Sequence, residues 1–414
     1  MKPDNFKVYG YRWIVLVAFM FIVAITQLVW ITFAPITGDA AKFYGVSDLS
    51  IGLLSMSFMI VYIIVSIPAS WVIDTYGIRV GVGIGAVLTA IFGLLRGLWA
   101  TNYTLVLIAQ IGVAIGQPFV LNAVTTVAAR WFPIRERATA SGMGSLAMYL
   151  GIFAGLVLTP YLTIHFQIGG MLMAYGITSV IAALVFIVFS RERPATPPCP
   201  PGMEVRSLVF DGFKQIFRQR EFILLLVVFF IGLGTFNAVT TWIEDIVRPS
   251  GLTSTQAGNI GGLMIVGGIL GALVVPTLSD HYRKRVPFII VALVGATLGL
   301  AGIAFATQYW LLLVMGFVMG FFLLSAGPIG FQYGAEITYP TPEGTSNGLL
   351  ILMGQISGIA FIFAMDSFRS PKTGSMMISL VVLVGLMLLG LVLAFFLTEP
   401  KTLLTQAPKP GDPA

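Results

Sequence analysis

Long apolar runs separated by short polar or charged segments fill almost the whole chain. Twelve runs have the length and hydropathy of a membrane-spanning helix, which needs roughly 20 mostly apolar residues. They are expected at 12–37, 49–73, 80–100, 103–129, 139–163, 168–189, 221–247, 254–278, 287–306, 309–335, 345–367 and 374–398. Because a helix satisfies its own backbone hydrogen bonds in lipid, this pattern predicts an all-α membrane protein with twelve transmembrane helices.

The longest polar interruption lies between the sixth and seventh runs and divides the chain into two halves. Its Pro-rich part and the charged stretch after it predict a linker followed by a short amphipathic helix on the membrane surface. The expected organisation is an N-terminal six-helix bundle at 1–189, a cytoplasmic linker at 190–220, a C-terminal six-helix bundle at 221–398 and a cytoplasmic tail at 399–414.

The two halves repeat each other at a nearly constant spacing. Asp74 begins an Asp-Thr-Tyr-Gly-Ile-Arg segment after the second run, and Asp280 follows the eighth run 206 positions later (280 minus 74). Glu136 follows the fourth run, and Glu343 follows the tenth run 207 positions later (343 minus 136). Matched features at one offset indicate a duplicated six-helix unit.

Composition and charge support a membrane protein and give its orientation. The chain is 57% hydrophobic and only 10% charged, whereas a soluble domain carries about 25% charged residues. Of the 23 Lys and Arg residues, a cytoplasmic N-terminus places 18 inside and 4 outside, with Arg96 inside a run. This bias predicts that both termini are cytoplasmic, and it explains the net charge of +6 without a nucleic-acid partner.

No constellation of catalytic or metal-ligating residues stands out. The single cysteine, Cys199, cannot form an intramolecular disulfide. The two histidines, His165 and His281, fall at a helix end and in a loop. Without a nucleophile motif, a metal cluster or a phosphate loop, we expect neither an enzyme nor a cofactor or metal site.

Polar residues inside the apolar runs are the candidates for chemistry. The first run ends with Gln27, Thr32 and Thr37, whose side chains need hydrogen-bond partners that hydrocarbon cannot give. This stretch is therefore expected to face a protein interior or a wet cavity with Trp30 on its wall, or else Trp30 packs between helices. Arg96 is expected to snorkel or to pair.

Neutral amides also lie in the runs, at Gln110, Gln117, Asn122, Asn237, Gln332 and Gln355. No carboxylate falls clearly at the centre of a run, since Glu244, Asp245 and Asp366 lie near outer ends. Carriers driven by protons or sodium usually need such a group, so the sequence favours transport without ion coupling.

Two six-helix halves, a central linker and the Asp-x-x-Gly-x-Arg segment at Asp74 to Arg79 resemble the major facilitator superfamily. The usual Gly ahead of the Asp is replaced by Ala69 or Ser70. The carboxylates at the inner helix ends can accept hydrogen bonds from a helix N-terminus or an Arg in one state and lose them in the other, or they can be solvated loop turns. The expected gate residues are Asp74, Arg79, Asp280 and Arg283.

Three segments are similar to the feline leukaemia virus subgroup C receptor family. They are Phe43 to Ser47, Gln117 to Asn122, and the run Glu336 to Leu350 with its unusual Glu-Ile-Thr-Tyr-Pro-Thr-Pro-Glu-Gly-Thr-Ser-Asn-Gly-Leu-Leu sequence. The resemblance implies an alternating-access uniporter of choline or ethanolamine, with haem as an older assignment for the family. Haem is disfavoured here, because neither His falls in the central part of a run.

By the same resemblance, Trp30 offers an aromatic face to a quaternary ammonium with Met59 beside it, and Gln117 and Gln355 hold the hydroxyl end. The family has a Tyr on its seventh helix, where this chain has Phe236 and Asn237. The predicted substrate-binding residues are Trp30, Met59, Gln117, Asn122, Phe236, Asn237 and Gln355.

We therefore predict a cell-membrane uniporter, working as a monomer, for a small organic cation or amino alcohol, with the solute and the lipid bilayer as its partners. A carrier of an organic anion, drug or haem is the first alternative. The second is a membrane receptor that binds a solute and signals. A sensor needs a cytoplasmic signalling surface, and the linker and tail are short.

Overall fold

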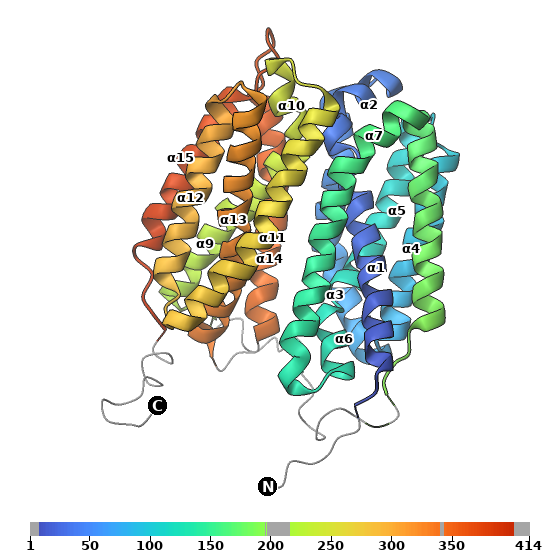
Figure 1. Ribbon diagram of the computed structural model, residues 1–414, viewed down its shortest axis with the longest axis vertical. Helices are drawn as coiled ribbons and strands as arrows, with labels where there is room; N and C mark the ends of the chain where they lie inside the picture. Colours follow the sequence, from blue (N-terminus) through green and yellow to red (C-terminus); the bar gives the residue numbers. More distant parts are fainter. Residues whose placement is uncertain (1–7, 195, 197–215, 340–342, 401–414) are drawn as a thin grey trace. The chain divides into compact units, whose positions relative to one another are not determined.

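The computed structural model describes residues 8–194, 196, 216–339 and 343–400, and their regular structure is entirely helical (Figure 1). The predicted amphipathic helix and nearly all of the predicted tail lie outside the described residues. The main helices are α1 (Tyr11–Ile31), α2 (Thr37–Tyr44), α3 (Asp48–Tyr76), α4 (Ile78–Leu98), α5 (Tyr103–Leu121), α6 (Val124–Trp131), α7 (Ile134–Phe189), α9 (Arg220–Thr241), α10 (Ile243–Val247), α11 (Ser254–Tyr282), α12 (Val286–Phe305), α13 (Tyr309–Thr338), α14 (Glu343–Ser367) and α15 (Met377–Ala394).

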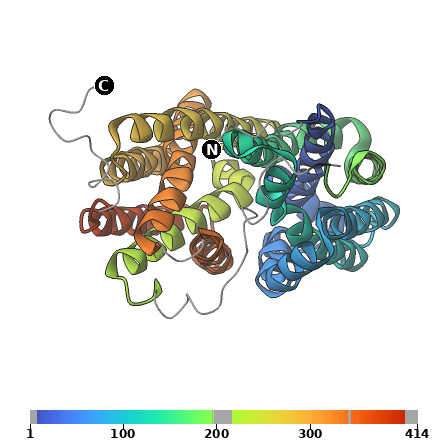
Figure 2. The same cartoon turned by 90° about the horizontal axis from the view of Figure 1, so that it is seen from below.

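The chain divides into two compact units, which are described separately. Unit 1 comprises Met1–Arg206 together with the short segments Thr241–Glu244 and Thr253–Gly262. Unit 2 comprises Ser207–Thr240, Asp245–Leu252 and Leu263–Ala414. Figure 2 views the helices nearly end-on. Each unit is a helical bundle, as expected for a chain that must satisfy its backbone polar groups inside lipid.

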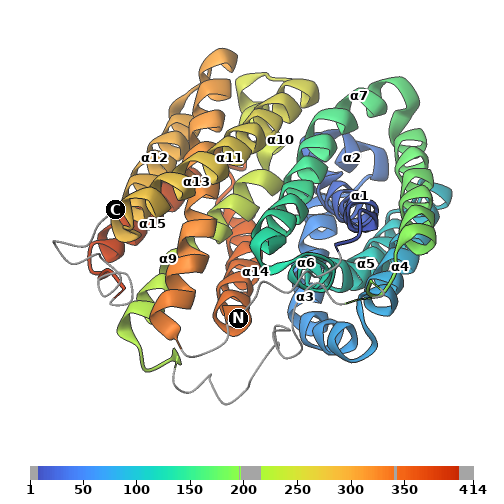
Figure 3. The same ribbon diagram turned by 60° about the horizontal axis from the view of Figure 1, so that its bottom comes forward.

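In unit 1, α1 and α4 pack against the long helix α7, and α5 packs against both α3 and α4. The backbone of α7 leaves the helical conformation at Gln167, where φ is 59°, so the 56-residue element is two helices joined at a kink. Figure 3 brings the end of unit 1 that carries α6 forward, where α6 packs on α7. In unit 2, α12 packs with α13 and α15, and α13 packs with α14.

Among the described residues, eleven helices are long and apolar enough to cross a membrane. One of them, Thr139–Phe189, has 51 residues and contains both of the predicted runs 139–163 and 168–189. A single crossing needs only about 20 residues, so the kink at Gln167 accounts for two runs within one element.

Three predicted runs are broken into two helices each. The first run ends α1 at Ile31 and resumes as α2 after a 3₁₀ turn that contains Pro35. The fourth run breaks after Leu121, three residues beyond Pro118, and the seventh breaks after Thr241. Because proline lacks a backbone N–H and its ring crowds the carbonyl four residues earlier, which for Pro35 is that of Ile31, Pro35 accounts for the first break.

Candidate functional site

The end of α1 is enclosed by protein, as the polar residues in it predict. Every residue from Ile25 to Gly38 is buried. Thr26 and Thr32 donate hydrogen bonds to carbonyls three or four residues earlier, at 2.8 Å and 2.9 Å, as Ser and Thr do when they lie within a helix. The hydroxyls are thus satisfied locally, and the stretch does not face lipid.

Trp30 projects from α1 onto α3 with only 7% of its surface exposed. Its indole Nε1 donates to the backbone carbonyl of Ser55 at 3.2 Å. Met59, which is fully buried, lies one helical turn beyond Ser55 on α3. Since residues four apart share one helix face, the structure places Met59 on the side of α3 that receives Trp30.

A buried cation contacts the residue that directly precedes Trp30. The side chain of Arg96, on α4, is 0% exposed, so the expectation that it snorkels to the membrane surface is wrong. Its guanidinium donates to the carbonyl of Val29 at 3.1 Å and to the side-chain oxygen of Gln110 on α5. A longer contact of 3.5 Å reaches the Thr32 hydroxyl.

Gln110 extends this network to α3. Its amide nitrogen donates to the carbonyl of Leu54 at 3.2 Å and to that of Val29 at 3.4 Å. We call Thr32, Arg96 and Gln110 the polar cluster. The carbonyls that accept from this cluster belong to Val29 and Leu54. These residues directly precede Trp30 and Ser55, which are hydrogen-bonded to each other. The cluster therefore joins α1, α3, α4 and α5 next to Trp30.

The polar cluster contains a charge without an acidic counter-charge. Within the part of the chain that the structure describes, the hydrogen-bond partners of Arg96 are neutral oxygens and its Nε has none. Its guanidinium also lies over the Phe33 ring, 5.8 Å from the ring centre. A guanidinium at the C-terminal end of a helix is stabilised by the carbonyls that the helix leaves unpaired there. Because α1 ends at Ile31, the Val29 carbonyl is one of these groups.

The two predicted substrate residues on α5 differ in their surroundings. Gln117 is 6% exposed. The amide of Asn122 accepts from the Tyr62 hydroxyl at 2.8 Å and donates to Ser66 and Ser70, at 3.0 Å and 2.9 Å to their hydroxyls. Asn122 therefore joins the break after α5 to α3, and its contact with a substrate stays a prediction.

The predicted substrate residues of unit 2 lie on α9 and α14. Asn237 donates to the carbonyl of Gly354 at 3.1 Å, which brings α9 beside Gln355. Phe236 is 7% exposed, and Gln355 is partly exposed. Trp30, Met59, Gln117 and Asn122 thus belong to unit 1, and Phe236, Asn237 and Gln355 belong to unit 2.

In unit 2, the charged residues of the predicted gate centre on Arg285, which the sequence analysis did not single out. Arg285 pairs with Asp280, and its guanidinium binds Glu336 at 3.0 Å. Burial lowers the pKa of Arg285, but hydrogen bonds and attraction from Glu336 and Asp280 outweigh this and raise it. Arg283 is exposed and has a positive φ of 51°, and its role as a gate remains a prediction.

Each unit also contains a carboxylate that the sequence analysis missed. Glu192 accepts from the backbone N–H groups of Ile78 and Arg79 at 3.1 Å and 2.9 Å, and it pairs with Arg130. Glu399 accepts in the same way from Arg285 and Val286, both at 3.0 Å. Both acids cap a helix N-terminus, where negative charge is favourable.

The sequence holds a signal for this pair of capping carboxylates. Each acid follows the last helix of its half and is closely followed by a proline, Pro194 or Pro400. Glu399 comes 207 positions after Glu192 (399 minus 192), the spacing already found for Glu136 and Glu343. Gate roles for Asp74 and Arg79 are not addressed by these contacts, apart from the N–H that Arg79 gives to Glu192.

Comparison with known proteins places these features in a family. Residues 9–362 match the model of the Major Facilitator Superfamily. The chain is 29% identical over 386 residues to Solute carrier family 49 member A3 of Xenopus tropicalis, covering 89% of this chain and 80% of that protein. It is also 29% identical over 414 residues to Choline/ethanolamine transporter FLVCR1 of Felis catus, covering 92% and 72%.

A solved structure shares the fold. It is the crystal structure of a bacterial homologue of the human lysosomal transporter Spinster, with a TM-score of 0.76, 16% identity and coverage of 97% of this chain and all of that one. The family and the named relatives make this chain a membrane transporter rather than an enzyme. In agreement with the duplicated halves and the segment from Asp74 to Arg79, the chain belongs to the major facilitator superfamily.

Proposed function

We propose that this transporter carries a small organic cation or amino alcohol, similar to choline or ethanolamine, by alternating access. The observation that supports this most directly is the state of Trp30. Its only hydrogen-bond donor is already bound to the Ser55 carbonyl, so its remaining chemistry is that of an aromatic face. An alkylated ammonium is attracted to such a face by about 0.5–2 kcal/mol.

The position of the polar cluster also suits this role for Trp30. Arg96 and Gln110 bind the carbonyl of Val29, the residue before Trp30, and the indole N–H binds α3. Trp30 is thus held both by its backbone and by the edge of its ring. Its side chain loses little further conformational freedom when a ligand binds, which improves affinity.

Two amides supply the second part of the proposed recognition. The side-chain amides of Gln117 in unit 1 and Gln355 in unit 2 have no hydrogen bond to the other described residues. An amide offers both a donor and an acceptor to a hydroxyl group. The proposal assigns them to the hydroxyl end of the solute, with Met59 and Phe236 as apolar neighbours of its alkyl groups.

Transport without ion coupling is supported by the contacts of Glu244 and Asp245, two acids near the end of a predicted membrane-spanning run. Glu244 is 4% exposed and accepts from the backbone N–H of Gly38 at 3.0 Å. Asp245 is paired with Arg248 at 2.8 Å and with Arg369 at 2.9 Å. Both carboxylates are thus already engaged by protein partners, and the proposal assigns neither of them to a coupling ion.

An organic anion is the second candidate, because Arg96 places a positive charge near Trp30. Against it, Arg96 is 0% exposed and its guanidinium donates to protein oxygens, so a substrate does not reach it. A receptor that binds the solute without moving it is separated from a carrier by flux measurements.

The central test is equilibrium binding and flux of choline with purified protein in proteoliposomes. Trp30→Ala should weaken choline affinity tenfold or more, a loss of about 1.4 kcal/mol, and Trp30→Phe should lose less. Trp71→Ala is the matched control, since Trp71 is 59% exposed on the outside of α3. If Trp30→Ala lowers the melting temperature but leaves affinity unchanged, Trp30 is a packing residue and the proposal fails.

The same vesicles test coupling and direction. With the membrane potential clamped, choline should equilibrate and should not accumulate when an inward proton or sodium gradient is imposed. Accumulation above equilibrium contradicts uniport, and binding without any flux favours a receptor.

We further propose twelve transmembrane helices, both termini in the cytoplasm and residence in the cell membrane, on the basis of the 18 to 4 distribution of Lys and Arg. In a Cys199→Ser background, a cysteine at Lys372 should react with an impermeant reagent in intact cells. A cysteine at Arg206 should react only with a permeant one, and labelling of this site from outside contradicts the orientation.

A further inference from the structure

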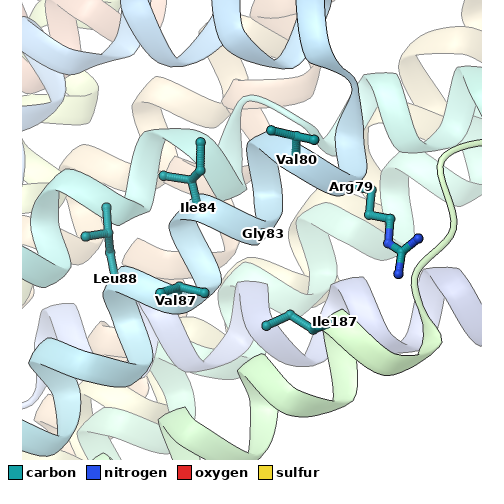
Figure 4. A pocket seen from close by; sticks show the side chains of 7 residues that line it. All are labelled: Arg79, Val80, Gly83, Ile84, Val87, Leu88 and Ile187. Atoms are coloured by element: carbon teal, nitrogen blue, oxygen red, sulfur yellow. The ribbon is translucent and has the colours of Figure 1, made fainter.

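A hollow of about 410 Å³ lies on the surface of unit 1, along the first turns of α4 and the end of α7. Figure 4 shows the side chains around it: Val80, Ile84, Val87 and Leu88 from α4, and Ile187 from α7. Arg79 stands at one end of this row, and Gly83 lies within it. We call this feature the α4–α7 groove. It is apolar along its length and basic at one end.

The groove exists because residue 83 has no side chain. A Cβ added at Gly83 meets no atom within 4 Å, whereas one added at Gly81 or Gly85 overlaps Ile73 or the backbone of Gly116. The neighbouring glycines thus allow close helix packing, which is their usual purpose in membrane proteins. Gly83 allows no such contact, and its effect is to leave space on the outer face of α4.

The groove faces the surroundings of the bundle. Val80, Ile84 and Val87 expose 47%, 39% and 41% of their surface, and α4 is one of the helices apolar enough to span the membrane. Side chains in this setting contact lipid rather than the transported solute. The occupant must therefore be a molecule that the bilayer supplies.

Arg79 determines what kind of lipid fits. It lies at the second residue of α4, where the helix enters the apolar layer, and its side chain is exposed. Its backbone N–H is bound to Glu192, but its guanidinium forms no ion pair among the described residues. Glu192 is the nearby acid, and it is already bound by two backbone N–H groups and Arg130.

We propose that the α4–α7 groove binds an anionic phospholipid, with one acyl chain along the groove and the headgroup phosphate on Arg79. A guanidinium matches phosphate oxygens in a two-point hydrogen-bonded geometry. Basic residues at the membrane surface attract anionic lipids. The apolar row beginning beside Arg79 gives the chain of that lipid a place next to its headgroup.

Native mass spectrometry of the purified full-length protein with added phosphatidylglycerol or phosphatidylcholine tests the site. The protein should retain phosphatidylglycerol about fivefold more strongly, the effect of one basic residue near an anionic lipid. Arg79→Gln should abolish this preference and Arg79→Lys should keep part of it. Gly83→Leu should reduce the binding of both lipids, because its side chain fills the groove.

Two control variants match these substitutions. Arg193→Gln removes another exposed Arg that lies outside the groove. Gly385→Leu adds the same side chain to α15, at a glycine that also has no neighbour within 4 Å. Both should leave lipid binding unchanged, and melting temperatures confirm that each variant is folded. Equal retention of the two lipids, or a preference that survives Arg79→Gln, overturns the proposal.

Discussion

The two units share one plan, yet at the position of Arg96 unit 1 buries a charge where unit 2 has an apolar side chain. The capping carboxylates Glu192 and Glu399 occupy matching positions, and each accepts from the first N–H groups of α4 or α12. At the same offset of 207, Arg96 corresponds to Ile303 (303 minus 96). Ile303 is 2% exposed, so both positions are buried but only one is charged.

The rest of the polar cluster follows the same rule. Thr32 corresponds to Val239 and Gln110 to Phe317, each 207 positions later. Unit 2 therefore closes the same helical framework with apolar side chains where unit 1 uses a guanidinium, an amide and a hydroxyl. Because burying a charge costs free energy unless it is fully hydrogen-bonded, the fold alone does not explain the cluster. What distinguishes unit 1 at this place is Trp30.

The largest expected effect comes from removing the charge. Arg96→Met removes the donor to the Gln110 side-chain oxygen, and an unsatisfied buried polar group costs about 1–3 kcal/mol. The Val29 carbonyl keeps Thr32 and Gln110 as donors. We expect a clear fall in melting temperature and a loss of choline flux of tenfold or more. Ile303→Met, at the matching position of unit 2, is the control and should cost less than about 1.5 kcal/mol.

A double variant separates stability from function. Arg96→Met combined with Gln110→Leu gives unit 1 an apolar arrangement like that of unit 2, and removing both partners together can be nearly neutral for stability. The melting temperature should recover relative to Arg96→Met while choline affinity stays low. If affinity recovers together with stability, the cluster serves only the fold.

The second largest expected effect concerns the ion pairs of Arg285 at the start of α12. In unit 2, Arg285→Ala removes the cation from Glu336 and Asp280, and Glu336 is only 13% exposed. Loss of hydrogen bonds to a charged partner costs about 1.5–3 kcal/mol. Arg283→Ala is the control, because an exposed side chain of this kind contributes roughly 0–1 kcal/mol. Thermal unfolding of both variants checks the order, and equal losses contradict it.

The apolar pattern was sufficient to predict the helical membrane fold, and the repeated Asp and Glu residues were sufficient to predict the duplication. Helix breaks were harder to predict. The run 12–37 is mostly apolar on both sides of Ile31, so hydropathy does not reveal that α1 ends there. Pro35 and Pro118 mark two of the breaks, but Thr241 has no proline before it within α9.

For the candidate site, the residue types predicted burial more reliably than they predicted contacts, and the substrate contacts themselves stay predictions. Trp30 was predicted from its polar neighbours, and its burial agrees. The burial of Arg96 was not predictable, because its partners are a backbone carbonyl at the end of another helix and two side chains from other parts of the chain, which only the fold brings together. The sequence predicts Arg283 rather than Arg285 as a gate residue. Residues 283–285 are all basic, and only the fold decides which of them binds Glu336.

The smallest effect concerns the two capping carboxylates themselves. Glu192→Gln and Glu399→Gln both remove the negative charge at the start of α4 or α12. Glutamine keeps one acceptor oxygen, which suffices at position 399, whereas at position 192 the two N–H groups bind different oxygens and one of them loses its acceptor. The interaction of a charge with a helix end contributes about 0.3–1 kcal/mol. Glu192 also forms an ion pair with Arg130. In unit 2 the Arg285 guanidinium pairs with Glu336 and Asp280, and Glu399 accepts the backbone N–H of Arg285.

Glu192→Gln should therefore lower the melting temperature more than Glu399→Gln does. An ion pair at this exposure contributes roughly 0–1 kcal/mol and weakens with salt. Raising the salt concentration should consequently narrow the difference in melting temperature between the two variants. The part of each decrease that comes from the lost helix cap should change less with salt. If Glu399→Gln lowers the melting temperature more, the two capping carboxylates are not equivalent. The correspondence between the starts of α4 and α12 is then limited to the backbone.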